Sequence, residues 1–206
     1  MTMQRTASGV ATGKPGLCVR LFLPWVFGTL FAAIIGWVTV VWIVFTSAAS
    51  TWDRSDKAHR AALWGGMGIL YGTLIGIAQW VVLRNRLRYG YRWIVATALG
   101  ECVYWILAFA PDANLTSMGR GSLIGACGGL ALGASQWTVI RRDLRYAWAW
   151  VVATVVGSVL GEVATQFIPA TGHPSVLYEI GPILSTAVTA LTTALLAVKL
   201  FSLQRQ

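Results

Sequence analysis

Glu101 and Glu162 are the side chains best able to carry chemistry, because each lies inside an otherwise apolar stretch of the sequence. A carboxyl group in the core of a bilayer is costly, so it must face protein or a water-filled cavity. In one interpretation, each glutamate is protonated and donates a hydrogen bond between helices. In the other, the pair carries a proton, a cation or a substrate. The sequence favours hydrogen bonding and leaves the second interpretation open.

No enzyme signature accompanies these two glutamates. The sequence contains no HExxH metal motif, no GxSxG motif between a strand and a helix, and no glycine loop for phosphate or dinucleotide. Its three cysteines have no paired spacing, and it has only two histidines. We therefore expect no catalytic residues, no metal and no cofactor.

The elements that must position the glutamates are six apolar runs. The chain is 56% hydrophobic and 11% charged, whereas a soluble domain carries about 25% charged residues. A helix of about 20 apolar residues spans the ~30 Å core of a bilayer. The sequence thus predicts an all-α membrane protein, with a disordered cytoplasmic tail over residues 1–16 and one six-helix transmembrane domain over residues 17–206. The runs cover residues 21–46, 61–83, 92–110, 121–141, 147–168 and 178–200.

The net charge of +9 reflects where the basic residues fall between these runs. If the helices alternate in direction, twelve basic residues lie on one side, which the positive-inside rule assigns to the cytoplasm. We expect a bacterial plasma (inner) membrane protein with both termini cytoplasmic. Expected partners are membrane lipids, helices of other membrane proteins or a second copy, and not nucleic acid. The twelve are Arg5, Lys14, Arg20, Arg84, Arg86, Arg88, Arg92, Arg141, Arg142, Arg145, Lys199 and Arg205.

One stretch of the chain occurs twice. Residues 72–93 and 129–150 lie 57 positions apart and share ten of 22 residues, including a Gln-Trp pair followed by arginine. Extended in both directions, the match predicts two-helix hairpins over residues 62–110 and 119–168. Their glycines step by four along one helix face, and a glutamine falls ~20° from that face. These small and amide side chains favour close helix packing in lipid. The predicted packing residues are Gly68, Gly72, Gly76 and Gln79, and Gly125, Gly129, Gly133 and Gln136.

Tryptophan and arginine residues flank each predicted helix pair. The indole of tryptophan keeps its ring apolar and its N–H hydrated, so it is typical of the membrane interface. The sequence therefore predicts interfacial anchors at Trp80, Arg84 and Trp93 in the first hairpin, and at Trp137, Arg141 and Trp150 in the second.

The second helix of each hairpin carries its own stripe, which also steps by four. The stripe that starts at Trp93 reaches Glu101, about 12 Å further along the helix, and the one that starts at Trp150 reaches Glu162. The first run matches this template at Trp25, and the sixth resembles the first helix of a hairpin. Helices 6 and 1 are therefore candidates for a third unit, in a pseudo-threefold arrangement about the membrane normal.

The segments QWVVLR (79–84) and QWTVIR (136–141), each after a glycine stripe, resemble a pattern in uncharacterised multi-pass bacterial membrane proteins. The resemblance covers most of residues 60–160 and implies an inner-membrane protein, without implying an activity. Two functions remain. The sequence favours a structural or accessory subunit without catalytic activity; the alternative is a small transporter or channel that uses Glu101 and Glu162. A hydrated cavity beside the glutamates would distinguish the two.

Overall fold

The computed structural model describes residues 17–46, 57–87, 90–108, 117–167 and 174–203. Over these residues the chain is all-helical, as predicted. The tail predicted for residues 1–16 lies outside them. The six helices are α1 (Leu17–Thr46), α2 (Lys57–Leu83), α3 (Gly90–Ala108), α4 (Ser117–Ile140), α5 (Trp148–Thr165) and α6 (Pro174–Leu203).

Five of the six helices are long and apolar enough to cross a membrane. The exception is α3, which has 19 residues and includes both Arg92 and Glu101. These two charged residues lower its mean hydropathy. The helix nevertheless packs against α2 and α4, so it belongs to the bundle as the other five helices do. The apolar segments are Leu21–Ile43, Arg60–Leu83, Gly119–Ile140, Trp148–Thr165 and Ile180–Leu200.

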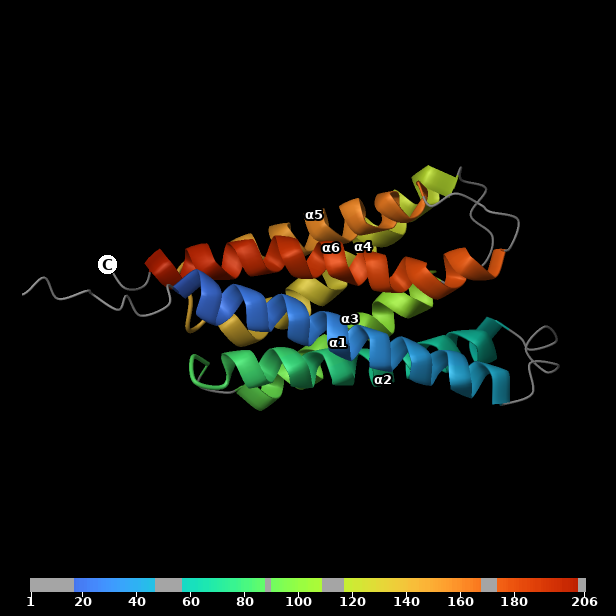
Figure 1. The fold of residues 1–206 in the computed structure, drawn as a ribbon, viewed down its shortest axis with the longest axis horizontal. Coiled ribbons are helices and arrows are strands. Elements are labelled where there is room, and N and C mark those ends of the chain that lie inside the picture. The colour runs from blue at the N-terminus through green and yellow to red at the C-terminus, as the bar shows by residue number, and fades with distance from the viewer. Residues whose placement is uncertain (1–16, 47–56, 88–89, 109–116, 168–173, 204–206) are drawn as a thin grey trace, which may run out of the picture.

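The helices form a closed ring. Each helix contacts the next one along the chain, and α6 contacts α1. Figure 1 shows their long axes side by side, with the start of α1 and the end of α6 at the same end of the bundle. The links from α2 to α3 and from α4 to α5 lie there too. We call this the arginine end, because Arg84 and Arg141 are exposed in those links.

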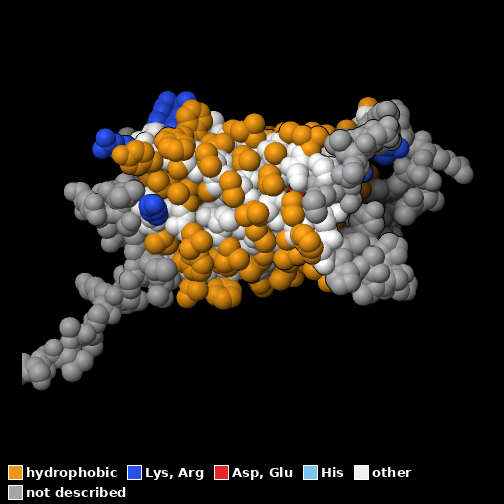
Figure 2. Space-filling model, turned by 90° about the horizontal axis from the view of Figure 1, so that it is seen from above, with side chains coloured by type: hydrophobic (Ala, Val, Ile, Leu, Met, Phe, Trp, Pro, Cys, Tyr) orange, Lys and Arg blue, Asp and Glu red, His pale blue; other side chains and the backbone are white. Residues whose placement is uncertain are grey.

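The outer surface of the ring is an apolar band. In Figure 2 hydrophobic side chains cover the middle of the molecule, and Lys and Arg side chains gather toward its ends. Phe27, Phe31 and Leu195 are each more than 60% exposed on this band. Helices satisfy their own backbone hydrogen bonds, so such a surface is stable against lipid. The structure thus agrees with a membrane-embedded protein.

Two apolar clusters fill parts of the interior. The cluster at the arginine end draws buried residues from all six helices, among them Leu21, Leu83, Trp93, Ile140 and Leu200. The second cluster takes its buried residues from α1, α2 and α3 alone; they are Ala32, Ala33, Trp37, Val40, Met67, Tyr71, Ile75 and Trp105. Apolar side chains of all six helices therefore pack together at the arginine end. Toward the opposite end, the apolar cluster lies only on the side of α1, α2 and α3.

Candidate functional site

Three tryptophans meet on the axis of the ring, near the arginine end. They are Trp25 of α1, Trp93 of α3 and Trp150 of α5, and we call them the tryptophan tier. Their ring centroids lie 6.0, 5.5 and 5.4 Å apart, with interplanar angles of 70°, 84° and 77°. Such edge-to-face contacts are favourable between aromatic rings. Together the three indole side chains fill the centre of the helix bundle at this level.

Trp93 and Trp150, predicted as interfacial anchors, are thus placed inside the ring, where their exposed fractions are 0% and 3%. Their indole N–H groups donate to glutamine side chains of the protein. Trp93 donates to Oε1 of Gln79 at 3.0 Å, and Trp150 donates to Oε1 of Gln136 at 2.8 Å. Each tryptophan therefore fixes the first helix of its own predicted hairpin.

The same two glutamines reach the neighbouring helix. Gln79 donates to Oγ1 of Thr29 on α1 at 3.3 Å. Gln136 donates to Oγ1 of Thr97 on α3 at 3.0 Å. Each glutamine thus joins three consecutive helices, and both glutamines are buried. Buried amides with satisfied partners rigidify the level just beside the tryptophan tier.

The remaining predicted anchors lie at the arginine end. Trp80 and Trp137 are partly buried, whereas Arg84 and Arg141 are exposed. The Arg141 guanidinium lies 5.1 Å from the centroid of the Trp137 ring. The structure contains no bilayer, so their anchoring role stays a prediction.

The three predicted packing glycines of α2 face α3 at very short range. A Cβ atom on Gly72 would lie 2.7 Å from the Cβ of Glu101 and 2.9 Å from the Cα of Ala98. A Cβ on Gly68 would lie 2.6 Å from the Glu101 carbonyl oxygen, and one on Gly76 would lie 2.9 Å from the Ile94 Cα. Only a residue without a Cβ allows backbones to approach so closely.

The three predicted packing glycines of α4 face α5 in the same way. A Cβ on Gly129 would lie 2.9 Å from the Cβ of Ser158 and 3.0 Å from the Cα of Val155. For Gly125 the nearest atom is the Ser158 carbonyl oxygen at 2.8 Å, and for Gly133 it is the Val151 Cα at 3.0 Å. All six glycines therefore face a helix of the ring itself.

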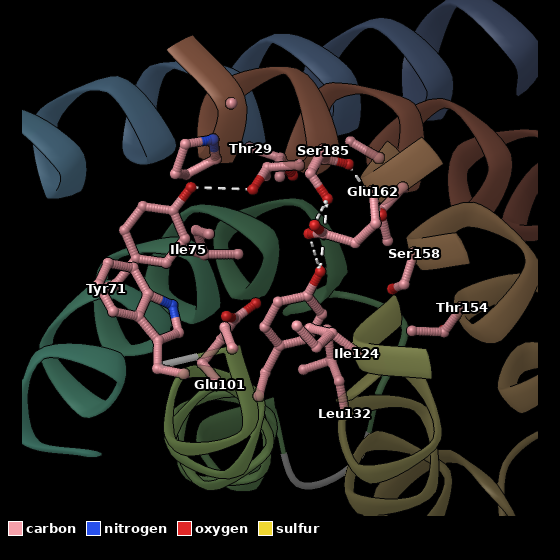
Figure 3. Close-up of a pocket in the computed structure, with 18 of the residues that line it drawn as sticks. Thr29, Tyr71, Ile75, Glu101, Ile124, Leu132, Thr154, Ser158, Glu162 and Ser185 are labelled. Atoms are coloured by element: carbon pink, nitrogen blue, oxygen red, sulfur yellow. Dashed lines mark hydrogen bonds between the residues drawn. The ribbon is translucent and has the colours of Figure 1, made fainter. Parts of the chain in front are cut away.

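A cavity of about 1080 Å³ occupies the interior between the tryptophan tier and the opposite end. All six helices contribute to its lining. Trp25 and Trp150 line it toward the arginine end, and Arg120, Gln166 and Phe167 line it toward the other. Glu101 and Glu162 both line this cavity, and Figure 3 shows their side chains pointing into it from different helices.

Glu162 is held by two hydroxyl groups. The Tyr104 hydroxyl donates to its Oε1 atom, and the Ser185 hydroxyl donates to the same atom at 3.0 Å (Figure 3). Tyr104 comes from α3 and Ser185 from α6, so this carboxyl group ties α5 to its neighbour α6 and to α3 across the interior. Hydroxyl donors on a carboxylate are among the stronger hydrogen bonds in proteins.

Glu101 lies across the cavity, on the stripe that starts at Trp93. Its side chain is 8% exposed, and its Cβ and Cγ atoms rest against Gly72. Trp105 lies one turn further along the same helix. The absence of a side chain on Gly72 therefore makes room for this glutamate beside the α2 backbone.

Tyr71 was not singled out from the sequence, although it lines the cavity and is only 2% exposed. Its hydroxyl oxygen lies 2.9 Å from Oγ1 of Thr186 on α6, so the side chain of α2 reaches past α1. The signal available was its position next to Gly72, on a helix where no other tyrosine occurs. An aromatic residue at such a position is equally typical of an ordinary core.

Among the described residues, no group of three or more His, Cys, Asp or Glu side chains is placed to hold a metal ion. The cavity can instead offer carboxyl, hydroxyl and amide oxygens to a ligand, together with aromatic rings. Searches against known protein families, curated proteins and solved structures found no match to this chain.

Proposed function

We propose that this protein binds a cation within the membrane and moves it across, as a small transporter in which Glu101 and Glu162 face the cation. The observation that carries this proposal is that both glutamates line one large cavity. A glutamate that served only helix packing would lie in a dry contact between two helices. The function that the sequence placed second is therefore the one that the geometry supports best.

A carboxyl group buried in lipid is stable only when it is neutralised, by a proton or by a positively charged partner. Arg120 is the one Lys or Arg among the described residues that line the cavity, and Glu162 accepts hydrogen bonds from hydroxyl groups. Exchange of protons for a cation at these carboxyl groups would need no covalent chemistry.

The tryptophan tier closes the cavity on the arginine side. We propose that a cation enters from the opposite end and passes to the cytoplasm only when the three rings separate. Bonds to Gln79 and Gln136 link Trp93 and Trp150 to helices that would have to move apart, and a bond to Thr193 does the same for Trp25. Such links suit a step between two discrete arrangements.

The same proposal includes the membrane setting. We propose six spans, including α3, in a bacterial inner membrane, with both termini cytoplasmic. We also propose two glycine-packed hairpins, with α6 and α1 as a third unit. This is supported by the equivalent bonds of Trp93 and Trp150 and by the bond of Trp25 to Oγ1 of Thr193 at 3.3 Å. The six glycines pack within the ring, so they give no support to an accessory subunit that binds other helices.

The orientation can be tested with single cysteines in a chain whose three native cysteines are replaced by alanine. We expect a cysteine at position 142, in an arginine link, to resist an impermeant maleimide in intact cells. A cysteine at position 56 should react. The opposite pattern would reverse the proposed topology, and lysed cells provide the control that both positions are reactive.

The function can be tested in proteoliposomes by following the uptake of three probes, which are protons, sodium and tetraethylammonium. We expect at least one to enter faster than in protein-free vesicles. Glu101→Gln should reduce that uptake at least tenfold, because glutamine keeps the shape and hydrogen-bonding capacity but cannot carry the charge. Asp143→Asn, a matched change in an arginine link, should leave the uptake unchanged.

Unchanged uptake in Glu101→Gln would remove the glutamate from the proposed path. Equal uptake rates with and without protein would contradict the proposed transport itself. Thermal unfolding of each variant in detergent shows that a lost activity is not a lost fold.

A further inference from the structure

The two sides of the cavity differ in chemistry, and this difference points to a class of substrate. On one side, Trp37, Tyr71 and Trp105 form what we call the aromatic wall. The centroid of the Trp105 ring lies 5.9 Å from that of Trp37 and 5.2 Å from that of Tyr71. On the other side, α5 and α6 contribute Glu162, Ser158, Ser185 and Thr189. Glu101 lies next to the aromatic wall, on the same helix as Trp105.

We infer, on the basis of the proposed function, that the substrate is a hydrophobic organic cation with a single positive charge, such as a quaternary ammonium or phosphonium compound. A carboxylate and the face of an aromatic ring both attract such a charge, and tryptophan does so best among the aromatic residues. The apolar groups around the charge would fill the aromatic wall.

The size of the cavity supports an organic substrate. Its volume of about 1080 Å³ slightly exceeds the range of ~300–1,000 Å³ that is typical of sites for drug-sized molecules. A water molecule takes up only ~30 Å³, and an unhydrated sodium or potassium ion is smaller still. A site built for such an ion alone would not need this space.

The charges that line the cavity support a single positive charge. Among the described lining residues, the charged ones are Glu101, Glu162 and Arg120. With both carboxyl groups ionised, these three side chains sum to one negative charge. A monovalent cation balances that charge, and a low-dielectric interior favours a neutral set of charges.

The aromatic wall also holds a polar atom without a partner. Trp37 is 8% exposed and lines the cavity, and its Nε1 atom is the buried side-chain atom that has no hydrogen-bond partner among the described residues. Buried donors are nearly always satisfied. A water molecule held in the cavity would supply the missing acceptor, because a quaternary cation has no lone pair that could accept this hydrogen bond.

The test uses two probes of nearly equal size and shape but opposite charge, tetraphenylphosphonium and tetraphenylborate. We expect the purified full-length protein in detergent to bind tetraphenylphosphonium, measured by calorimetry, and to bind tetraphenylborate at least tenfold more weakly. Glu101→Gln and Glu162→Gln should each weaken phosphonium binding about tenfold or more. Trp105→Phe should weaken it about threefold, since phenylalanine attracts cations less strongly. Trp148→Phe, on the outer surface (62% exposed), is the matched control and should have no effect.

Equal binding of the two probes would overturn the inference, since it would show an apolar cavity without charge selection. Phosphonium binding that persists in both glutamine variants would overturn it as well. If the phosphonium does not bind while proteoliposomes still take up protons or sodium through Glu101, the substrate class is wrong and the proposed function stands. If all these activities are missing, both proposals fail.

Discussion

Replacement of Gly72 by leucine is expected to prevent the ring from closing between α2 and α3. The first atom of any side chain at this position would meet the Cβ of Glu101 at 2.7 Å and the Cα of Ala98 at 2.9 Å. The second of these atoms belongs to the backbone, so the clash cannot be relieved by a rotamer change. Overpacking of a core costs ~1–3 kcal/mol even where side chains can shift, and we expect ~3 kcal/mol or more here. The melting temperature in detergent and the size-exclusion profile would report the loss.

Gly66→Leu is the matched control, since it makes the same change on the same helix. Gly66 is exposed, and a Cβ atom there would have no neighbour within 4 Å. We expect this variant to melt like the wild type. If Gly72→Leu does so too, α2 and α3 do not approach as closely as described. Gly129→Leu should reproduce the effect between α4 and α5.

The second large effect is expected from Gln136→Leu. Leucine has nearly the same volume as glutamine, but it removes both the acceptor of the Trp150 indole and the donor to Thr97. A buried donor left without a partner costs ~1–3 kcal/mol, so we expect stability to fall by about that amount. Tryptophan emission should also change, because Trp150 belongs to the tryptophan tier.

Thr138→Val provides the control on the same helix. Thr138 is exposed, and its hydroxyl donates only to the Ser135 carbonyl oxygen of its own helix. This variant should leave stability and emission unchanged. If Gln136→Leu is as stable as Thr138→Val, then the bonds at the tryptophan tier do not hold the helices together. Gln79→Leu should behave as Gln136→Leu does, through the loss of its bond to Trp93.

The helices and their inward stripes were accessible from the sequence because lipid imposes strict rules on both. Every spanning segment must be a long apolar helix, so the apolar runs marked the helices to within a few residues at most ends. Steps of four placed Glu101 with Trp93 and Glu162 with Trp150 on one face each. Both stripes face the interior of the bundle in the structure. Their residues line the cavity, apart from Trp93, which is buried but does not border it.

The direction of a tryptophan at a helix end could not be read in the same way. An indole beside arginines is typical of the headgroup region, and Trp93 and Trp150 have such neighbours in the sequence. What places them inside is the closure of the ring, which brings α1, α3 and α5 together on one axis. That arrangement depends on contacts between residues far apart in the chain, such as Trp25 and Thr193.

The cavity itself was equally hidden. Its existence depends on the sum of side-chain volumes at each level of the ring, and no local pattern reports that sum. At the tryptophan tier three large rings fill the axis. At the level of Glu101 the equivalent positions on α1 and α5 are Ala33 and Ser158, and these small side chains leave space.

The closure of the ring between α6 and α1 has a consequence for the genetics of the protein. In a closed ring every helix has two neighbours, so none is first by position. The start of α1 lies at the same end of the bundle as the end of α6 (Figure 1). A circularly permuted gene that starts at α3 and joins α6 to α1 by a short linker would keep every helix in its original direction. Such cuts are tolerated where chain ends lie close together at the surface. The order in which the helices are synthesised can therefore be changed without changing the ring and the cavity that they form.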